Sequence, residues 1–164
     1  MDLVIAPLLP EHWTAVRSIY EQGIATGEAT FTTEAPGWEA WDRAHLADCR
    51  LVAMEGPQVV GWAALLPISS RECYRGVCEV SIYITDTSRG AGLGTQLLSA
   101  LIGESERHGI WMLQSVIFPE NSASIRLHEK HGFRFVGRRE RIAQREGLWR
   151  DTVLLERRSR SIGS

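Results

Sequence analysis

Cysteine is scarce in this chain, and long apolar runs and an excess of basic residues are missing. Cys49, Cys73 and Cys78 are odd in number and lack paired metal-ligand spacing, which favours buried free thiols over a disulfide framework or a metal site. No apolar run approaches the ~20 residues that span a bilayer, and the first residues lack a secretion signal. The net charge of −2 indicates no surface for nucleic acid. We expect one cytoplasmic domain over residues 1–164, with a frayed tail at 157–164 and no metal, membrane or nucleic-acid partner.

Two common phosphate-binding motifs and one hydrolase motif are also missing. A dinucleotide fingerprint needs glycine at its first, third and sixth positions, but the sixth residue from Gly90 is Thr95 and the sixth from Gly92 is Leu97. The chain has no Gly-Lys-Ser/Thr triplet of nucleoside triphosphatases and no Gly-x-Ser-x-Gly elbow of hydrolases. Its glycine-rich segment therefore belongs to neither of these nucleotide-binding classes.

The segment from Ile82 to Thr95 is the most informative part of the sequence. A strand pattern runs into Gly90, Gly92 and Gly94, and a leucine-rich helix begins at once. A helix start carries amide donors without intrahelical partners and a partial positive charge, and glycines leave those amides uncovered. We expect a pyrophosphate to bind here. The alternative is a turn that only lets the strand and the helix pack closely.

Strand and helix patterns alternate along the chain. The expected strands cover Leu3 to Leu8, Leu51 to Met54, Val59 to Leu66, Val77 to Thr85, Met112 to Phe118, Phe133 to Ile142 and Trp149 to Leu155. Four helices are expected. The first begins at Pro10, the second covers Trp38 to Asp48, the third covers Leu93 to Arg107, and the fourth runs from Asn121 or Ser122 to Gly132. The threonine-rich stretch from Gly23 to Pro36 is expected to be a loop.

A carboxylate lies in the middle of one apolar strand. Alternation places Glu79 and Ser81 on one face of this strand and Val80 on the other. A charge at such a position costs free energy unless it is paired or faces a wet cleft. Two interpretations remain open, an ion pair with Arg75 or Arg89, or a general base at the edge of a ligand cleft.

Two polar residues belong to the last expected helix. Asn121 ends a strand and begins this helix, where its side chain either caps the helix or hydrogen-bonds a ligand amide. His128 lies about two turns further on and is either a buried core residue or an acid–base group.

In this order and spacing, the segments resemble the GCN5-related N-acetyltransferase (GNAT) superfamily. The resemblance rests on Arg89-Gly90-Ala91-Gly92-Leu93-Gly94, Asn121 with Ser124, His128-Glu129 and Gly132-Phe133. The strand Glu79 to Ile84 and the helix segment Ser124 to Glu129 are similar to the branch that acetylates phosphinothricin and methionine sulfoximine. The resemblance extends over nearly the whole chain and is weak before about Val52.

The resemblance implies an α+β fold in three layers, with a mixed, twisted sheet of about seven strands flanked by about four helices. The fourth and fifth strands are splayed apart, and the pantetheine arm of acetyl-CoA lies between them. The implied cofactor-binding residues are Ile82, Tyr83, Ile84, Arg89, Gly90, Ala91, Gly92, Leu93, Gly94, Thr95, Asn121 and Ser124.

The resemblance also implies a primary amine as acceptor and a catalytic pair, Glu79 and His128. A protonated amine has no lone pair, so Glu79 is expected to remove a proton directly or through a water. His128 stands where the leaving thiolate is protonated. None of the three cysteines has an evident activating base, so direct attack in a ternary complex is favoured over a covalent enzyme intermediate.

The acceptor pocket is where the chain departs from this branch. Members usually have a histidine after the strand glutamate and a Trp-Arg-Pro-Phe-like stretch upstream; this chain has Val80 and Pro67-Ile68-Ser69-Ser70-Arg71 at those places. The expected acceptor-binding residues are Phe31, Arg71, Arg75, Glu79, Val80 and Ser81. The two arginines are the candidates for binding a carboxylate.

We therefore predict an N-acetyltransferase that acts on a small amino-acid-like amine of the phosphinothricin or methionine sulfoximine type. Two alternatives remain open. One is acetylation of a protein N-terminus or lysine, and the other is a non-catalytic module that binds acetyl-CoA. The resemblance further implies a homodimer.

Overall fold

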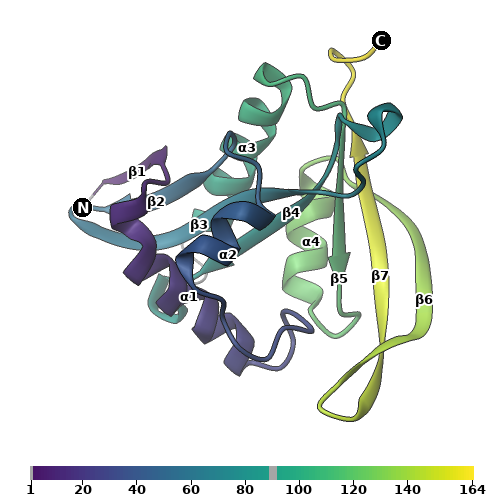
Figure 1. Cartoon of the computed structure of the whole chain (residues 1–164), viewed down its shortest axis with the longest axis horizontal. Helices are drawn as coiled ribbons and strands as arrows, with labels where there is room; N and C mark the ends of the chain where they lie inside the picture. The colour runs from purple at the N-terminus through teal and green to yellow at the C-terminus, as the bar shows by residue number, and fades with distance from the viewer. Residues whose placement is uncertain (1, 89–91) are drawn as a thin grey trace.

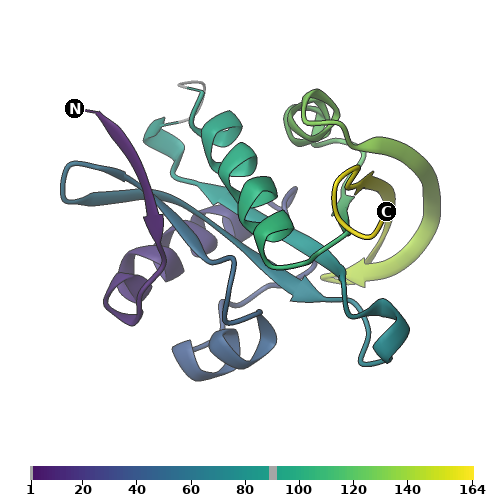
Figure 2. The ribbon, with the colours of Figure 1, turned by 90° about the horizontal axis from the view of Figure 1, so that it is seen from above.

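The computed structural model describes residues 2–88 and 92–164. Its strands are β1 (Leu3–Pro7), β2 (Leu51–Glu55), β3 (Gln58–Pro67), β4 (Val77–Ile84), β5 (Met112–Ile117), β6 (Arg134–Arg145) and β7 (Leu148–Arg158). Its helices are α1 (Trp13–Ala25), α2 (Trp38–Ala44), α3 (Leu93–Arg107) and α4 (Ser122–Lys130), with 3-10 turns η1 (Pro10–His12), η2 (Glu72–Tyr74) and η3 (Asp86–Ser88). The strands form one sheet in the order β1-β2-β3-β4-β5-β7-β6, with α1 and α2 on one face and α3 and α4 on the other (Figures 1 and 2).

The pairing of neighbouring strands changes from antiparallel to parallel at the centre of the sheet. Neighbouring strands are antiparallel except β4 and β5, which run parallel and pair over only three positions, from Val77 with Met112 to Glu79 with Gln114. Beyond Glu79, β4 stays paired with β3 while β5 stays paired with β7, so the two central strands diverge. This confirms the mixed sheet with splayed fourth and fifth strands.

Each face of the sheet has its own apolar core. The leucines of α3 recur at helical spacing and pack against Cys78 and Val80 of β4. On the opposite face, Trp41 and Trp62 are almost fully buried, and Tyr83 of β4 packs against this cluster. Alternation along β4 thus directs the side chains of Cys78 and Val80 to α3, and the side chain of Tyr83 to α1 and α2.

One glycine brings α1 close to the central strand. A Cβ atom at Gly23 would lie 2.6 Å from Cδ1 of Tyr83, far inside van der Waals contact. Only glycine therefore allows the last turns of α1 to rest on β4, and this contact fixes where the following loop leaves the helix. That loop becomes a wall of the site described below.

Several boundaries differ from the expected ones. Helix α3 has the expected bounds, whereas α2 ends at Ala44 rather than Asp48, and β6 and β7 are longer than expected. In the tail that was expected to fray, the Ser159 hydroxyl donates to the Glu106 carboxylate and the Arg158 guanidinium donates to the Ile162 carbonyl. None of the described helices combines the length and the apolar character needed to cross a membrane.

Candidate active site

The divergence of β4 and β5 opens two adjoining cavities. The smaller one, of about 300 Å³, lies between Glu79 on β4 and Val116 on β5. The larger one, of about 540 Å³, extends toward the start of α3. Both cavities are lined by Ala29, Ile82, Tyr83, Asn121 and Ser124. A ligand with an extended arm can therefore lie across both.

The larger cavity contains the predicted phosphate site. Gly92 caps α3 with a φ of 75°, a left-handed conformation that favours glycine, and Gly92, Leu93, Gly94 and Thr95 all line the cavity. The amides of the first helical turn have no intrahelical acceptors, so they can donate to an anion. The predicted residues Arg89, Gly90 and Ala91 lie outside the described residues.

Gly94 has a packing role in addition to lining the cavity. A Cβ atom at this position would lie 3.1 Å from Cδ1 of Ile84 and 3.2 Å from a methyl of Leu127. The glycine therefore lets α3 approach both β4 and α4 at the point where the strands diverge. Both interpretations of the glycine segment therefore fit Gly94, which lines the cavity and permits close packing, whereas a Cβ atom at Gly92 would meet nothing within 4 Å.

The edge of β4 that faces β5 is suited to an extended ligand. Pairing between these strands ends at Glu79, while β4 continues to Ile84. Backbone groups from Val80 onward on this edge therefore lack a strand partner in β5, and an amide-containing arm can hydrogen-bond to them. This edge, the α3 start and the paired cavities together fit a long phosphorylated ligand with a pantetheine-like arm.

Asn121 acts as a helix cap in this structure. Its Oδ1 accepts a hydrogen bond from the backbone amide of Ser124 at 3.2 Å, which confirms the expected cap. Its Nδ2 donates to the Glu28 carbonyl at 3.3 Å. Asn121 and Ser124 both line the two cavities, so the predicted cofactor contacts remain sterically accessible to them.

Glu79 is hydrogen-bonded, and none of the described arginines pairs with it; Arg89, the other arginine considered as its partner, lies outside the described residues. Its Oε1 accepts from Nε2 of Gln114 at 2.9 Å, across the last pair of the parallel ladder. Arg75 instead pairs with Glu72 at 3.6 Å and lies over the Trp111 ring. The Glu79 side chain lines the smaller cavity, where a carboxylate held on one side can accept a proton on the other.

His128 is a buried residue that also lines the smaller cavity. It is 1% exposed, and its Nδ1 lies 2.7 Å from the Ser124 carbonyl. Burial lowers the pKa of His128; the Ser124 contact raises it and the charge of His131 lowers it further. The ring is therefore neutral near pH 7, and with Nδ1–H donating to the Ser124 carbonyl, Nε2 carries the lone pair. This Nε2 is buried and has no hydrogen-bond partner among the described residues.

One wall of the smaller cavity, called the acceptor wall below, comes from the loop after α1, residues 26–37. Phe31 makes an edge-to-face contact with Phe118 at a centroid distance of 4.9 Å, and both rings line the smaller cavity with Val80 and Ser81. Arg71 and Arg75 do not line either cavity. They flank η2, at the end of the sheet where β4 and β5 are still paired, so their predicted contact with an acceptor does not fit this structure.

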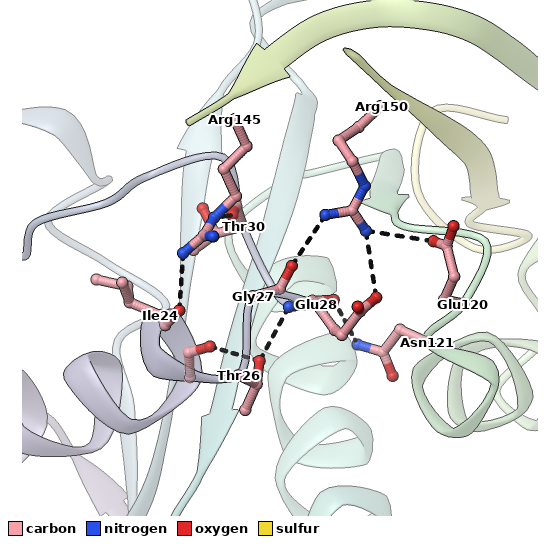
Figure 3. Close-up of polar contacts among 10 residues, drawn as sticks. Ile24, Thr26, Gly27, Glu28, Thr30, Glu120, Asn121, Arg145 and Arg150 are labelled. Atoms are coloured by element: carbon pink, nitrogen blue, oxygen red, sulfur yellow. Dashed lines mark hydrogen bonds and ion pairs between the residues drawn. The ribbon is translucent and has the colours of Figure 1, made fainter. Parts of the chain in front are cut away.

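The β6–β7 hairpin holds this loop in place (Figure 3). Arg145 donates to the carbonyls of Ile24 at 2.9 Å and Thr30 at 3.1 Å. Arg150 donates to the Gly27 carbonyl at 3.1 Å and pairs with the carboxylates of Glu28 and Glu120 at 3.2 and 3.4 Å. Both arginine side chains are nearly buried, so the wall of the cavity is fixed by residues that are more than 100 positions away in sequence.

Sequence reasoning missed several residues of the site, among them Gln114, Arg145, Arg150 and Thr152. Thr152 of β7 is 2% exposed and lines the smaller cavity, and its Oγ1 has no hydrogen-bond partner among the described residues. No local pattern distinguishes these residues from ordinary strand residues. Only the alternation of β5 and β7 could have indicated which of their side chains share a face with Glu79.

The cysteines are not ready nucleophiles. Burial raises the pKa of Cys49 to about 12 and that of Cys78 to about 11, so both thiols stay protonated near pH 7. Cys73 is exposed and lines neither cavity. Within the described residues, no three His, Cys or acidic side chains gather in a way that could hold a metal ion.

Comparisons with known proteins agree with this geometry. The family model described as "Acetyltransferase (GNAT) family" matches residues 13–133. An L-methionine sulfoximine/L-methionine sulfone acetyltransferase of Pseudomonas aeruginosa is 36% identical over 121 residues, 72% of this chain and 70% of that protein. A phosphinothricin N-acetyltransferase of Alcaligenes faecalis is 33% identical over 151 residues, 87% of this chain and 76% of that protein. A Salmonella typhimurium structure solved with its cofactor acetyl-CoA has a TM-score of 0.90 at 27% identity and covers 100% of this chain and 98% of its own.

Proposed function

Because the chain belongs to the acetyltransferase (GNAT) family, we propose that it transfers the acetyl group of acetyl-CoA to the primary amine of a small amino-acid-like molecule. The observation that carries this proposal is the pair of adjoining cavities between β4 and β5. One contains a helix start suited to phosphate, and the other contains a carboxylate suited to an amine. The relatives that act on methionine sulfoximine and phosphinothricin support a small acceptor.

The donor binds along the open edge of β4. The amides of Leu93 to Thr95 receive the pyrophosphate, and the backbone from Ile82 to Ile84 receives the pantetheine arm. Acetyl-CoA supplies the acetyl group as a thioester. Its carbonyl gains negative charge during attack, and an amide of the same strand edge stabilises that charge.

Glu79 receives the proton that the acceptor amine must lose. The hydrogen bond from Gln114 fixes one carboxylate oxygen and leaves the other to face the cavity or a water. The amine then attacks the thioester directly, because neither buried cysteine is ionised near pH 7. Proton transfer thus precedes or accompanies attack in a ternary complex.

His128 completes the reaction at the thiol. Its lowered pKa leaves the ring neutral near pH 7, so the resting residue has no proton to donate from Nε2. The ring therefore accepts the proton that the amine nitrogen loses once it has attacked the thioester, and passes this proton to the leaving thiolate. This makes His128 a proton carrier rather than a resident acid.

Calorimetry with acetyl-CoA and release of free thiol with a panel of amines test the proposal. We expect acetyl-CoA to bind and thiol to be released with small amines, with methionine sulfoximine and phosphinothricin included in the panel. Binding without thiol release from any acceptor would favour the non-catalytic module. Acetylation of proteins alone, detected by mass spectrometry, would favour the protein acetyltransferase.

The homodimer stays a prediction. Several large apolar side chains of the β6–β7 hairpin are exposed, including Phe135, Leu148 and Trp149. Light scattering after size exclusion tests the oligomeric state, and a single-chain mass would contradict the prediction.

A further inference from the structure

The smaller cavity, where the acceptor reacts under the proposed function, has an unusual balance of charge. Among the described residues that line it, Glu79 is the only acidic one, and no arginine or lysine contributes to its wall. The remaining lining is aromatic, aliphatic, hydroxyl, amide or neutral imidazole. Within the described part of the lining, a carboxylate therefore faces an acceptor without an arginine or lysine to balance a second negative charge.

Two guanidinium groups that hold the acceptor wall are occupied by other partners (Figure 3). Arg145 donates to two backbone carbonyls of the loop. Arg150 pairs with both Glu28 and Glu120 and lies over the Phe118 ring at 4.1 Å. Two carboxylates thus oppose the charge of Arg150, and the Glu146 carboxylate opposes that of Arg145 at 3.8 Å, so both guanidinium groups already have anionic partners.

The buried polar atoms that lack partners in this cavity are neutral. Thr152 Oγ1 and His128 Nε2 are both buried, and among the described residues neither has a hydrogen-bond partner. Both residues line the cavity, and neither brings a charge that could stabilise an anion.

We propose that this site prefers primary amines whose neighbouring acidic group is absent or masked, such as alkylamines and amino-acid amides, over free amino acids. The proposal rests on the proposed function and names the substrate class of that same site. An ammonium group is attracted to Glu79, which then receives its proton. A free amino acid would bring its own carboxylate, two bonds from the amine, beside Glu79, where like charges repel and none of the described lining residues is an arginine or lysine that could offset them.

The test compares three matched acceptors, namely L-methionine sulfone, its primary carboxamide and the corresponding amine without the carboxyl group. We expect kcat/KM for the carboxamide and for the decarboxylated amine to exceed kcat/KM for the acid by about tenfold or more. The ammonium group of the carboxamide is more acidic than that of the free acid, whereas the ammonium group of the decarboxylated amine is less acidic. A preference for both compounds over the free acid therefore excludes amine basicity as the cause. Added salt is expected to reduce the ratio, because it screens charge repulsion but not a steric clash.

A matched pair of variants tests the origin of the preference. Thr32 lines the cavity on the partly exposed loop, whereas its neighbour Thr33 is exposed and does not line it. Thr32→Arg adds the missing cation, and we expect it to raise the relative kcat/KM for the acid several-fold, by about the size of one charge interaction. Thr33→Arg adds the same net charge outside the cavity, and the ratio of kcat/KM between the uncharged acceptors and the acid is expected to stay as in the wild type.

Equal or better use of the free acid by the wild-type enzyme would overturn this inference and leave the proposed function intact. The same is true if Thr32→Arg binds acetyl-CoA normally but leaves the ratio unchanged. If none of the three acceptors, nor any other amine in the panel, releases thiol while acetyl-CoA still binds, the proposed function itself fails. The wild-type comparison needs no variant, so a folding defect in Thr32→Arg does not prevent the decision.

Discussion

The substitution Glu79→Gln removes the proposed base with little change in shape. The hydrogen bond at 2.9 Å can survive, because the carbonyl of the new amide can accept from Gln114 as the carboxylate does. Loss of that bond would cost about 1 kcal/mol, so we expect the free energy of unfolding to change by less than about 1 kcal/mol. General-base help contributes roughly 10² to 10⁴ in rate, so kcat should fall by about that factor near pH 7.

The pH dependence of the loss identifies its cause. Acceptor amines lose their own proton as the pH rises, and an α-amino group does so near pH ~8. The difference in kcat between wild type and Glu79→Gln should therefore shrink at high pH, where the enzyme no longer has to remove a proton. Thiol release at a series of pH values measures this, and calorimetry should find little change in acetyl-CoA affinity.

A matched variant separates proton removal from orientation. Gln114→Leu keeps the carboxylate of Glu79 and removes only its hydrogen-bond donor, so we expect it to lose less than about tenfold in kcat. An equal loss for Glu79→Gln at every pH, or no loss at all, would refute the assignment of Glu79 as the base.

Three further predictions follow from packing, burial and loop contacts. Gly94→Val inserts a branched side chain against Ile84 and Leu127, so stability should fall by about 1–3 kcal/mol and calorimetry should show weaker acetyl-CoA binding. Because the folded-state pKa of His128 is depressed, its contribution to stability is complete above the ordinary histidine pKa of 6.5. That contribution is lost as the pH falls below 6.5, by at most about 1.4 kcal/mol per pH unit, which urea unfolding measures. Arg150→Met releases the acceptor loop, and kcat/KM for amines should fall by about tenfold with a smaller change in acetyl-CoA affinity.

Each of these predictions has a control in the chain. Gly103→Val changes the same residue type in the same helix where a Cβ would meet only the Arg107 side chain; equal effects at both glycines would contradict the packing account. His128→Gln should reduce the loss of stability below pH 6.5, whereas the part contributed by His45, whose pKa burial also lowers, should remain. Arg139 is exposed on the same hairpin, so an Arg139→Met variant as impaired as Arg150→Met would remove the proposed role of the loop contacts.

The sequence by itself determined the local structure around the predicted phosphate site. Alternation, helical spacing and glycine placement are local properties, so they predicted α3 with its observed bounds and the face of β4 on which Glu79 lies. The cap made by Asn121 follows from the same kind of signal, because its acceptor oxygen and the Ser124 amide are three residues apart.

Only the tertiary structure decided how charge and polar groups are arranged around the acceptor. Glu79 meets Gln114, 35 residues away, and not the sequence neighbour Arg75. Arg145 reaches the Ile24 carbonyl across 121 positions, and His128 loses its charge because distant segments bury it. Such contacts depend on which strands pair and where they diverge, and no short stretch of sequence contains that information.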